Sequence, residues 1–314
     1  MEHVALGNSE LGITRLGLGA WAIGGPWKWG WGRQSDQDSV QTIHASLDAG
    51  INWIDTAPVY GLGRSESVVG NALRTTAHTP YIFTKCGLVW DTSGNVMDNI
   101  SASSIRNECE ESLRRLGVDT IDLYQIHWPR PDEDIEEAWT TMAELKEEGK
   151  VRHIGVSNFN VDQMERAGAI APVTSLQPPY SLVRRGIEEK ILPFCLENEI
   201  GTLAYSTMAS GLLSGKMSRE RIANLPDDDW RKSSSWFNEP DLARNLELAG
   251  FLGDLGRRHD VIAGAIAIAW ALLHPGITAA IVGLRKPEQV QEMVAASQVS
   301  LSVEEIDALS SFLD

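Results

Sequence analysis

Four side chains of types that transfer protons follow consecutive apolar runs of this chain. Asp55 ends the run INWID, Lys85 ends YIFTK, and His127 ends TIDLYQIH. Tyr60 comes five residues after Asp55, in a loop rich in Pro and Gly. Because the carboxyl ends of parallel strands meet at one mouth of a barrel, we expect the four side chains to converge there.

These four types together suit acid–base work on a carbonyl group. A free phenol has a pKa of about 10, so Tyr60 alone is a weak proton donor at neutral pH. A nearby Lys85 ammonium, held charged by Asp55, is predicted to lower that pKa. A neutral His127 would orient a substrate oxygen, while another group delivers a hydride. Taken singly, each residue also fits a turn, packing or surface role; their placement on consecutive strands favours catalysis.

The elements that position these residues alternate between strands and helices. An opening hairpin is expected in VALG and LGITRLG, and Ser35 and Gly50 are typical of the two ends of a helix. The expected strands are 17–22, 51–55, 81–85, 120–127, 152–158, 175–177, 201–206 and 278–284. The expected helices are 35–49, 65–74, 101–116, 136–148, 161–169, 187–198, 241–258, 262–274 and, as the last one, 287–296.

Eight such strand–helix units with no linker predict an α/β fold, a (β/α)8 TIM barrel. We expect a single domain over residues 1–314, with a short N-terminal β-hairpin and extra C-terminal helices. The strands are short and almost wholly apolar, as is typical of strands covered on both faces.

Composition excludes several classes of protein. The 314 residues are 43% hydrophobic and carry a formal charge of −16, which disfavours nucleic acid and anionic membrane surfaces as partners. The three cysteines are scattered, so neither disulfides nor a metal site is expected, and a cytoplasmic location is favoured. The N-terminus does not have the pattern of a signal peptide, and the longest apolar run, 261–273, is too short for a membrane span.

The sequence resembles the aldo-keto reductase family along most of its length. The matching stretches are GLGAWAIGG, GINWIDTAPVYGLGRSESVVGNAL, IFTKCG, SLRRLGVDTIDLYQIHWP, IGVSNF, LQPPYSL and AAIVGLRKPEQVQE. The likeness is nearest to the bacterial general-stress and inositol-operon oxidoreductases. It implies Asp55, Tyr60, Lys85 and His127 as the catalytic tetrad, with Tyr60 as the general acid for reduction and the general base for oxidation.

Two glycine-rich stretches only mimic nucleotide motifs. GLGAWA at 17–22 is followed by a poor helix start, and GLLSGKM at 211–217 has the wrong spacing for a P-loop. The resemblance instead implies that Ser157, Asn158 and Gln177 hold a nicotinamide carboxamide, and that the Tyr205 ring stacks on it. It also implies a pyrophosphate loop over 206–216 and an adenosine segment over 283–292. The expected cofactor contacts in these two segments are Ser206, Gly211, Leu212, Ser214, Lys216, Gly283, Arg285 and Gln289. Trp21, in the loop after the first strand, is a further expected contact.

The basic pair Arg285 and Lys286 favours NADP (NADPH) over NAD, because a guanidinium suits a 2′-phosphate. A solvated helix start would also explain the pair. Gln289 and Met293 stand where many relatives have a basic residue and Asn, so NAD stays open as the weaker alternative.

Eleven tryptophans, many in predicted active-face loops, indicate an aromatic wall for a small carbonyl or alcohol substrate. The substrate pocket is expected to contain Trp21, Trp29, Trp90 and Trp128. Arg33 is a candidate contact for an anionic substrate or, equally, a surface residue. Cys86 is expected to point away from the barrel interior. Because little sequence follows the last predicted helix, we expect an open pocket.

Two other functions stay open. A Schiff-base aldolase would use Lys85 as nucleophile, although pairing with Asp55 would keep it charged. A non-catalytic nicotinamide sensor is also known in this family. The absence of an evident interface stripe favours a monomer.

Overall fold

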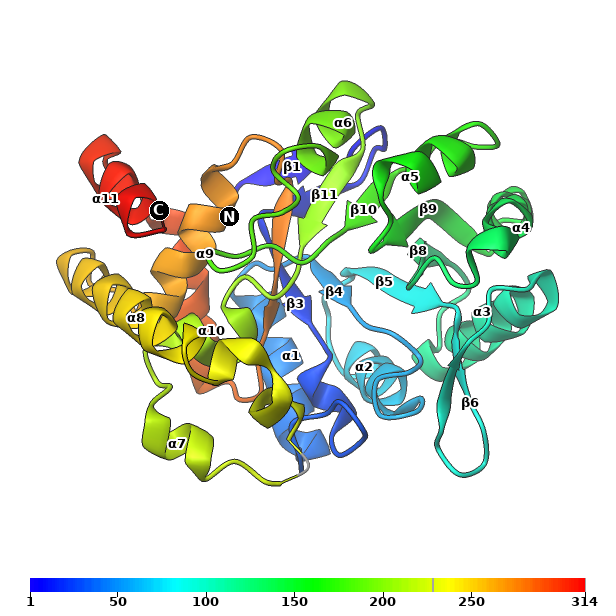
Figure 1. Cartoon of the computed structure of the whole chain (residues 1–314). Helices are drawn as coiled ribbons and strands as arrows, with labels where there is room; N and C mark the ends of the chain where they lie inside the picture. Colours follow the sequence, from blue (N-terminus) through cyan, green and yellow to red (C-terminus); the bar gives the residue numbers. More distant parts are fainter. Residues whose placement is uncertain (228, 314) are drawn as a thin grey trace.

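Eight parallel strands form a closed barrel in the computed structural model, which describes residues 1–227 and 229–313 (Figure 1). The strands follow one another around the barrel in chain order, and the last strand, β12, pairs with the first, β3, to close it. Their bounds are β3 Leu16–Gly19, β4 Trp53–Asp55, β5 Tyr81–Cys86, β8 Ile121–Ile126, β9 Val151–Ser157, β10 Ser175–Gln177, β11 Gly201–Ala204 and β12 Ala279–Gly283. The predicted (β/α)8 TIM barrel is confirmed.

The strands are buried on both faces, which explains why their sequences are almost continuously apolar. Inside the barrel the Trp53 indole fills the space beside β3. A Cβ on Gly17 would lie 2.2 Å from that ring, so only glycine fits there. Large residues on one strand thus require small ones on its neighbour.

Helices surround the barrel, and their predicted ends are largely confirmed. The Ser35 side chain accepts a bond from Asp38 N, and Gly50 follows the helix end at a φ of 93°. Gly117 ends another helix in the left-handed region. The main helices are α1 Asp36–Asp48, α2 Arg64–Arg74, α3 Ala102–Leu116, α4 Ile135–Glu147, α5 Val161–Gly168, α6 Ile191–Glu197, α8 Asp241–Arg258, α9 Ala263–Leu273 and α10 Glu288–Val294.

The N-terminal hairpin, β1 His3–Ala5 and β2 Gly12–Thr14, is confirmed and closes one end of the barrel. Leu6, Leu11 and Ile13 pack into the core cluster that contains Trp53. The Trp53 indole N–H donates to Thr14 O at 2.9 Å. The opposite end, where the strands terminate, is open to a ligand.

Three parts of the secondary structure differ from prediction. A second hairpin, β6 Leu88–Trp90 and β7 Val96–Asp98, follows β5, since the tight turn at Asp91 joins runs too short to recognise. The helix predicted over 187–198 begins only at Ile191, after a series of turns. The helix ending at Ala296 is not the last, because α11 Val303–Leu313 follows it.

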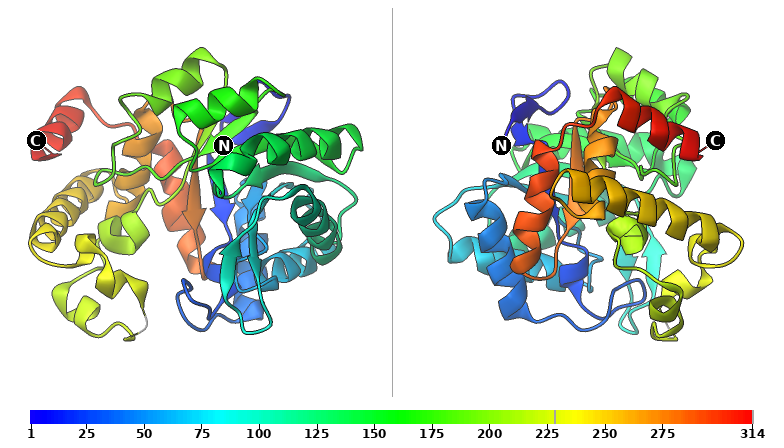
Figure 2. Two further views of the ribbon diagram at one scale, coloured as in Figure 1. Left: turned by 45° about the vertical axis from the view of Figure 1, so that its right-hand side comes forward. Right: turned by 90° about the vertical axis from the view of Figure 1, so that its left-hand side faces the viewer.

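The added helix α11 packs on α8, with the Phe251 and Phe312 rings stacked 5.8 Å apart. It lies at one edge of the molecule, away from the mouth of the barrel (Figure 2). The loop after β3, the β6–β7 hairpin and the long segment after β11 all extend from the same side in these views. That segment contains the short helix α7 Arg219–Ala223.

Among the described residues, no helix combines the length and the apolar character needed to cross a bilayer. The most apolar helix, α9, is buried almost all round between the barrel and α8. Its hydrophobicity therefore serves the core.

Candidate active site

Lys85 and Asp55 form a buried ion pair at the ends of neighbouring strands. Lys85 Nζ lies 2.7 Å from Asp55 Oδ2, and their side chains are 0% and 3% exposed. The ammonium also donates to Thr56 O at 2.9 Å, and Gln177 donates to Asp55 Oδ1 at 2.8 Å. Each charge has hydrogen-bond partners beyond its counter-ion, as a buried pair requires.

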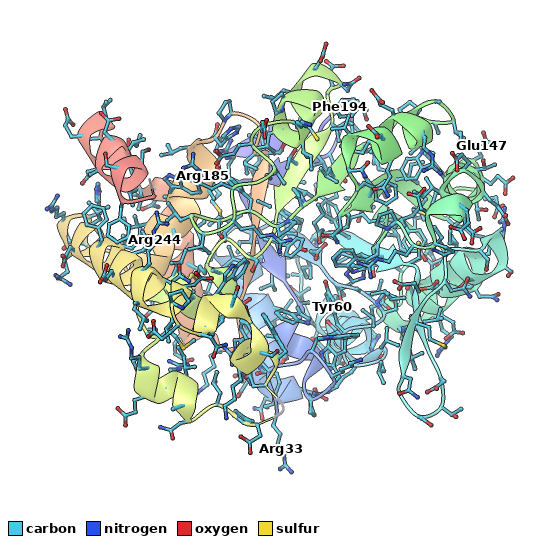
Figure 3. All side chains as sticks on the ribbon, viewed as in Figure 1. Arg33, Tyr60, Glu147, Arg185, Phe194 and Arg244 are labelled. Atoms are coloured by element: carbon cyan, nitrogen blue, oxygen red, sulfur yellow. The ribbon has the colours of Figure 1, made fainter. Side chains whose placement is uncertain are left out.

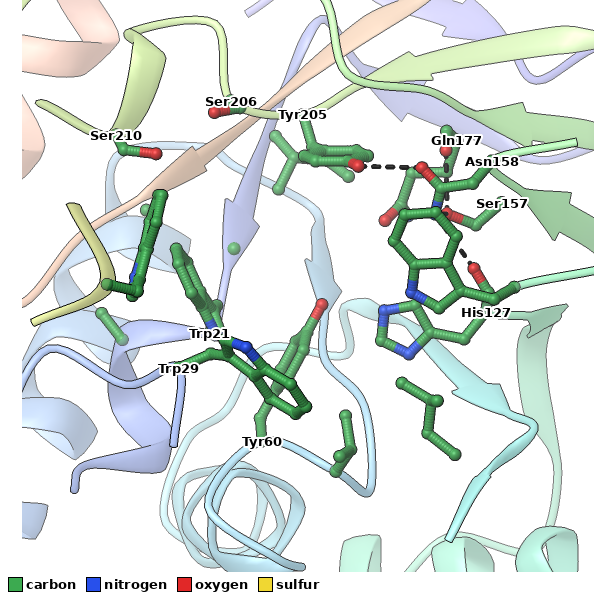
Figure 4. Close-up of a pocket in the computed structure, with 18 of the residues that line it drawn as sticks. Trp21, Trp29, Tyr60, His127, Ser157, Asn158, Gln177, Tyr205, Ser206 and Ser210 are labelled. Carbon is green, nitrogen blue, oxygen red and sulfur yellow. Dashed lines mark hydrogen bonds between the residues drawn. The ribbon is translucent and has the colours of Figure 1, made fainter. Parts of the chain in front are cut away.

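The Tyr60 phenol and the His127 imidazole lie beside this pair and face the cavity (Figure 4). The Tyr60 ring is 5.3 Å from Lys85 Nζ and 5.9 Å from the His127 ring, which it meets edge-on. Tyr60 lies near the centre of the molecule, on the loop after β4 (Figure 3). The structure thus brings together the four side chains that the sequence singled out; their catalytic roles remain a prediction.

The pKa of Tyr60 shifts in the direction opposite to the prediction. Burial raises the pKa of Tyr60 well above its usual value, and the Asp55 carboxylate acts in the same direction. The predicted lowering by Lys85 is therefore wrong for the protein by itself. Burial lowers the pKa of Lys85, opposed by Asp55, while burial and the Lys85 charge hold the pKa of His127 well below its usual value. At neutral pH the site accordingly has a protonated phenol beside a neutral imidazole.

A cavity of about 940 Å³ extends from these residues across the mouth of the barrel. Of the residues predicted to contact a cofactor, those that line it are Trp21, Ser157, Asn158, Gln177, Tyr205, Ser206, Gly211 and Gly283. Among the described residues, the predicted contacts outside its lining are Leu212, Ser214, Lys216, Arg285 and Gln289. The cavity therefore contains the residues expected near the nicotinamide, part of the predicted pyrophosphate loop and, from the predicted adenosine segment, Gly283.

The polar groups predicted to hold the carboxamide form one network. The Tyr205 hydroxyl donates to Asn158 Oδ1 at 2.8 Å, and Asn158 Nδ2 donates to His127 O at 3.0 Å. The Ser157 hydroxyl donates to Gln177 O at 2.8 Å. This network fixes the Tyr205 ring and the Asn158 amide against the cavity (Figure 4).

The cavity walls also leave room for a flat ring and an anionic group. A Cβ built on Gly283 would meet no atom within 4 Å, so this wall is open. In the loop after β11, Ser206, Ala209, Ser210 and Gly211 all have positive φ values between 48° and 91°. Such strained backbone is typical of ligand sites and turns N–H groups toward anions. The residues present therefore fit a nicotinamide dinucleotide.

The residues outside the lining have other partners. Leu212 is fully buried in the core, and the Ser214 hydroxyl closes a turn by donating to Gly211 O at 2.6 Å. Lys216 Nζ lies 3.3 Å from Glu292 Oε2. Arg285 donates through Nε to Gln34 Oε1 at 2.9 Å and through a terminal nitrogen to Arg33 O at 2.6 Å. The guanidinium expected to face a phosphate is thus already bound to the loop after β3.

Tryptophans from separate loops line the substrate side. The members that line the cavity are Trp21, Trp27, Trp29, Trp31, Trp128, Trp230 and Trp236. Trp90, also expected in the substrate pocket, lies on the β6–β7 hairpin, outside the cavity lining in the part of the chain that is described. Its neighbours on that hairpin, Leu88, Val96 and Met97, line the cavity instead.

Arg33 is exposed and points outward at the edge of the molecule, so it is not placed for a substrate (Figure 3).

The prediction that Cys86 points away from the barrel interior is confirmed. Its sulfur lies 3.8 Å from Met142 Sδ in the core between barrel and helices.

Buried carboxylates behind β5 were not identified from the sequence. Glu66 accepts from Thr84 Oγ1 at 2.6 Å and pairs with Arg115 at 2.7 Å. Glu108 accepts from Gly87 N at 3.0 Å and from Ser104 Oγ. Burial raises the pKa of Glu108 to about 7. Both carboxylates support the strand that contains Lys85. They were not identified because, in a single sequence, a buried acidic residue on a helix looks the same as an exposed one.

The family is decided by comparison with known proteins. The sequence model of the Aldo/keto reductase family matches residues 15–314. The chain belongs to the aldo/keto reductase family. It is an NAD(P)H-dependent oxidoreductase, from a family whose members act on aldehydes and ketones.

Individual relatives agree over the full length. The chain is 38% identical to aldo-keto reductase YhdN of Bacillus subtilis (strain 168), covering 100% of this chain and 94% of that protein. It is 34% identical to the NADH-specific methylglyoxal reductase of Escherichia coli (strain K12), with 96% and 95% covered. The structure of the glycerol dehydrogenase AKR11B4 from Gluconobacter oxydans superposes with a TM-score of 0.91 at 39% identity, covering 99% and 95% of the two chains.

The geometry also weighs against a Schiff-base aldolase. Lys85 Nζ is buried and directed at Asp55 and Thr56, so its lone pair is not available to a substrate carbonyl.

Proposed function

We propose that this chain, acting as one domain, reduces small aldehydes and ketones to alcohols reversibly, with NADPH as cofactor. The observation that carries the proposal is the Tyr60 hydroxyl at the cavity wall, beside a buried Lys85–Asp55 pair and a neutral His127. A proton donor, a charge that stabilises its conjugate base and an orienting imidazole meet at one place.

When bound, reduced nicotinamide supplies a hydride to the carbonyl carbon. The Tyr60 O–H bond breaks, and its proton forms the O–H bond of the alcohol. The raised pKa keeps Tyr60 protonated until charge develops on the substrate oxygen. In oxidation the same phenol, deprotonated, accepts the proton of the alcohol.

Lys85 and Asp55 act on Tyr60 through charge. As the phenol loses its proton, the ammonium 5.3 Å from its ring stabilises the phenolate in a water-poor site. Asp55 holds the ammonium in place through the 2.7 Å contact. The neutral His127 ring, 5.9 Å from the Tyr60 ring, would donate a hydrogen bond to the substrate oxygen and so set its orientation.

The cofactor would lie along the wall from Tyr205 to Gly211. Ser157, Asn158 and Gln177 would hold the carboxamide, the Tyr205 ring would stack on the nicotinamide, and the strained 206–211 loop would face the pyrophosphate. Arg285 would reach the 2′-phosphate. The Trp21, Trp29 and Trp128 rings would form an apolar wall for the substrate.

NADH is a second candidate cofactor, and a specific observation favours it. The Arg285 guanidinium already donates to Gln34 and to Arg33 O. One full-length relative is named as NADH-specific.

Titration of the purified protein with NADPH and with NADH, followed by tryptophan fluorescence, tests the proposal. Quenching with tighter NADPH binding, together with turnover of small aldehydes, is the expected result. Tight binding without turnover would identify a sensor, and failure of both nucleotides to bind would refute the proposal.

A further inference from the structure

We propose that Gln34 sets the preference between NADPH and NADH by competing with the 2′-phosphate for Arg285. The inference rests on the proposed function, in which Arg285 is the phosphate-binding residue. Gln34 lies in the loop after β3, far from Arg285 in sequence, and neither the sequence patterns nor the relatives' names assign it a role.

The two side chains form a reciprocal pair. Arg285 Nε donates to Gln34 Oε1 at 2.9 Å, and Gln34 Nε2 donates to Arg285 O at 2.8 Å. Ser39 Oγ accepts a further bond from Gln34 Nε2 at 3.1 Å, and Arg64 donates to Gln34 O at 2.6 Å. Gln34 is therefore held in place before any ligand arrives, with its acceptor directed at the guanidinium.

Arg285 is equally constrained from its own side. Gln289 Oε1 accepts from the backbone N–H groups of Arg285 and Lys286, at 2.9 and 3.1 Å. The backbone at this position is thus fixed, and only the guanidinium can change partner. Its partners, the Gln34 amide and Arg33 O, are neutral, so the arginine keeps its full positive charge.

The surroundings favour an anion over these neutral acceptors. Burial lowers the pKa of Arg285, and the positive charge of Arg231 acts in the same direction. Arg231 has its own carboxylate, Asp229, at 2.7 Å. A phosphate placed at Arg285 would therefore meet a cation that contacts no carboxylate among the described residues, and would displace only hydrogen bonds to neutral oxygens.

The relative affinity for NADPH and NADH follows from this exchange of hydrogen-bond partners at Arg285. NADH leaves the Gln34–Arg285 pair intact, whereas NADPH must replace it. Removing the Gln34 acceptor spares NADPH that cost, while a carboxylate at position 34 would raise it, because a charged acceptor holds a guanidinium more strongly.

The test measures dissociation constants of NADPH and NADH for the full-length protein by fluorescence titration. Gln34→Leu is expected to tighten NADPH binding about tenfold with little change for NADH. Gln34→Glu is expected to weaken NADPH binding by about the same factor. Gln37→Leu, at an exposed site on the first turn of α1, is the matched control and should leave both constants unchanged.

The same Gln34 substitution is then measured in the Arg285→Ala variant, which completes a double-mutant cycle. There, Gln34→Leu should no longer alter the ratio of the two constants. Shifts of the same sign in both Gln34 variants, no shift in either, or an unchanged Gln34→Leu effect without Arg285 would overturn the inference. Loss of NADPH binding in Arg285→Ala with inert Gln34 variants would leave the proposed function standing, whereas failure of both nucleotides to bind the wild type would refute that function itself.

Discussion

Lys85 and Arg285 are both cations of the predicted site, but the structure holds them in opposite ways. Lys85 is fully buried and bound to a carboxylate that is itself held by Gln177. Arg285 is partly exposed and bound to a neutral amide and a carbonyl oxygen. A buried charge with a charged partner is fixed, since separating the pair strands both charges away from water. A cation with neutral partners near solvent remains free to exchange them for an anion.

The difference separates two tasks. The end of β5 keeps its charges in one arrangement, as a proton-transfer site requires. The β12–α10 turn supplies a charge whose partner changes with the ligand. Substitutions in the fixed region are expected to have the largest effects, followed by those in its support and in the aromatic wall.

Replacement of the proton donor should have the largest effect on turnover. Tyr60→Phe is expected to lower kcat for aldehyde reduction by about 10²–10⁴-fold, because the developing alkoxide loses its acid. Cofactor affinity should stay nearly unchanged. Steady-state kinetics and fluorescence titration provide the measurements. Tyr81→Phe, at the opposite end of β5, is the control; equal loss in both variants, or loss of cofactor binding in Tyr60→Phe, would mean a structural role for Tyr60.

Removal of one member of the buried pair should lower the free energy of unfolding. Lys85→Met leaves the Asp55 carboxylate buried without its counter-ion, at an expected cost of about 3–5 kcal/mol. Adding Asp55→Asn should restore part of that stability but no turnover. Urea denaturation followed by circular dichroism measures both. If the single variant were as stable as the wild type, the pair would not be the fixed element we describe.

The support behind β5 should show a pH dependence of its own. The folded-state pKa of Glu108, about 7, lies above its usual value of 4.5, so folding favours the protonated form. Its contribution to stability is fully present below pH 4.5 and is lost as pH rises through 7, by about 3 kcal/mol in total. Glu108→Gln should flatten this part of the curve of unfolding free energy against pH. An identical curve for the variant would assign the slope to other groups.

The aromatic wall should give the smallest effect. Trp29 lines the cavity and Trp90 does not, although both were expected in the pocket. Trp29→Ala is therefore expected to raise KM for an aromatic aldehyde by about 3–10-fold, from lost ring contacts. Trp90→Ala should leave KM unchanged. Kinetics with saturating cofactor compare the two, and a larger effect at Trp90 would contradict the described cavity.

Strand ends and helix ends account for most of what could be predicted. Asp55, Lys85 and His127 close three apolar runs, and parallel strands can close into a barrel only with those ends together. Ser35, Gly50 and Gly117 mark helix ends through local hydrogen bonding and positive φ values. Helix ends depend on residues close together in the chain, so they can be predicted from one sequence.

The partners of each side chain were decided only by the tertiary structure. That Arg285 binds Gln34, that Gln177 binds Asp55, and that Glu108 supports Gly87 are contacts between segments far apart in the chain. The pKa of Tyr60 was mispredicted for the same reason, since burial depends on every element around the phenol and the Asp55 carboxylate adds to its effect. Residue types and spacing thus determined the barrel and the four reactive groups, whereas packing decided which charges are fixed and which can exchange.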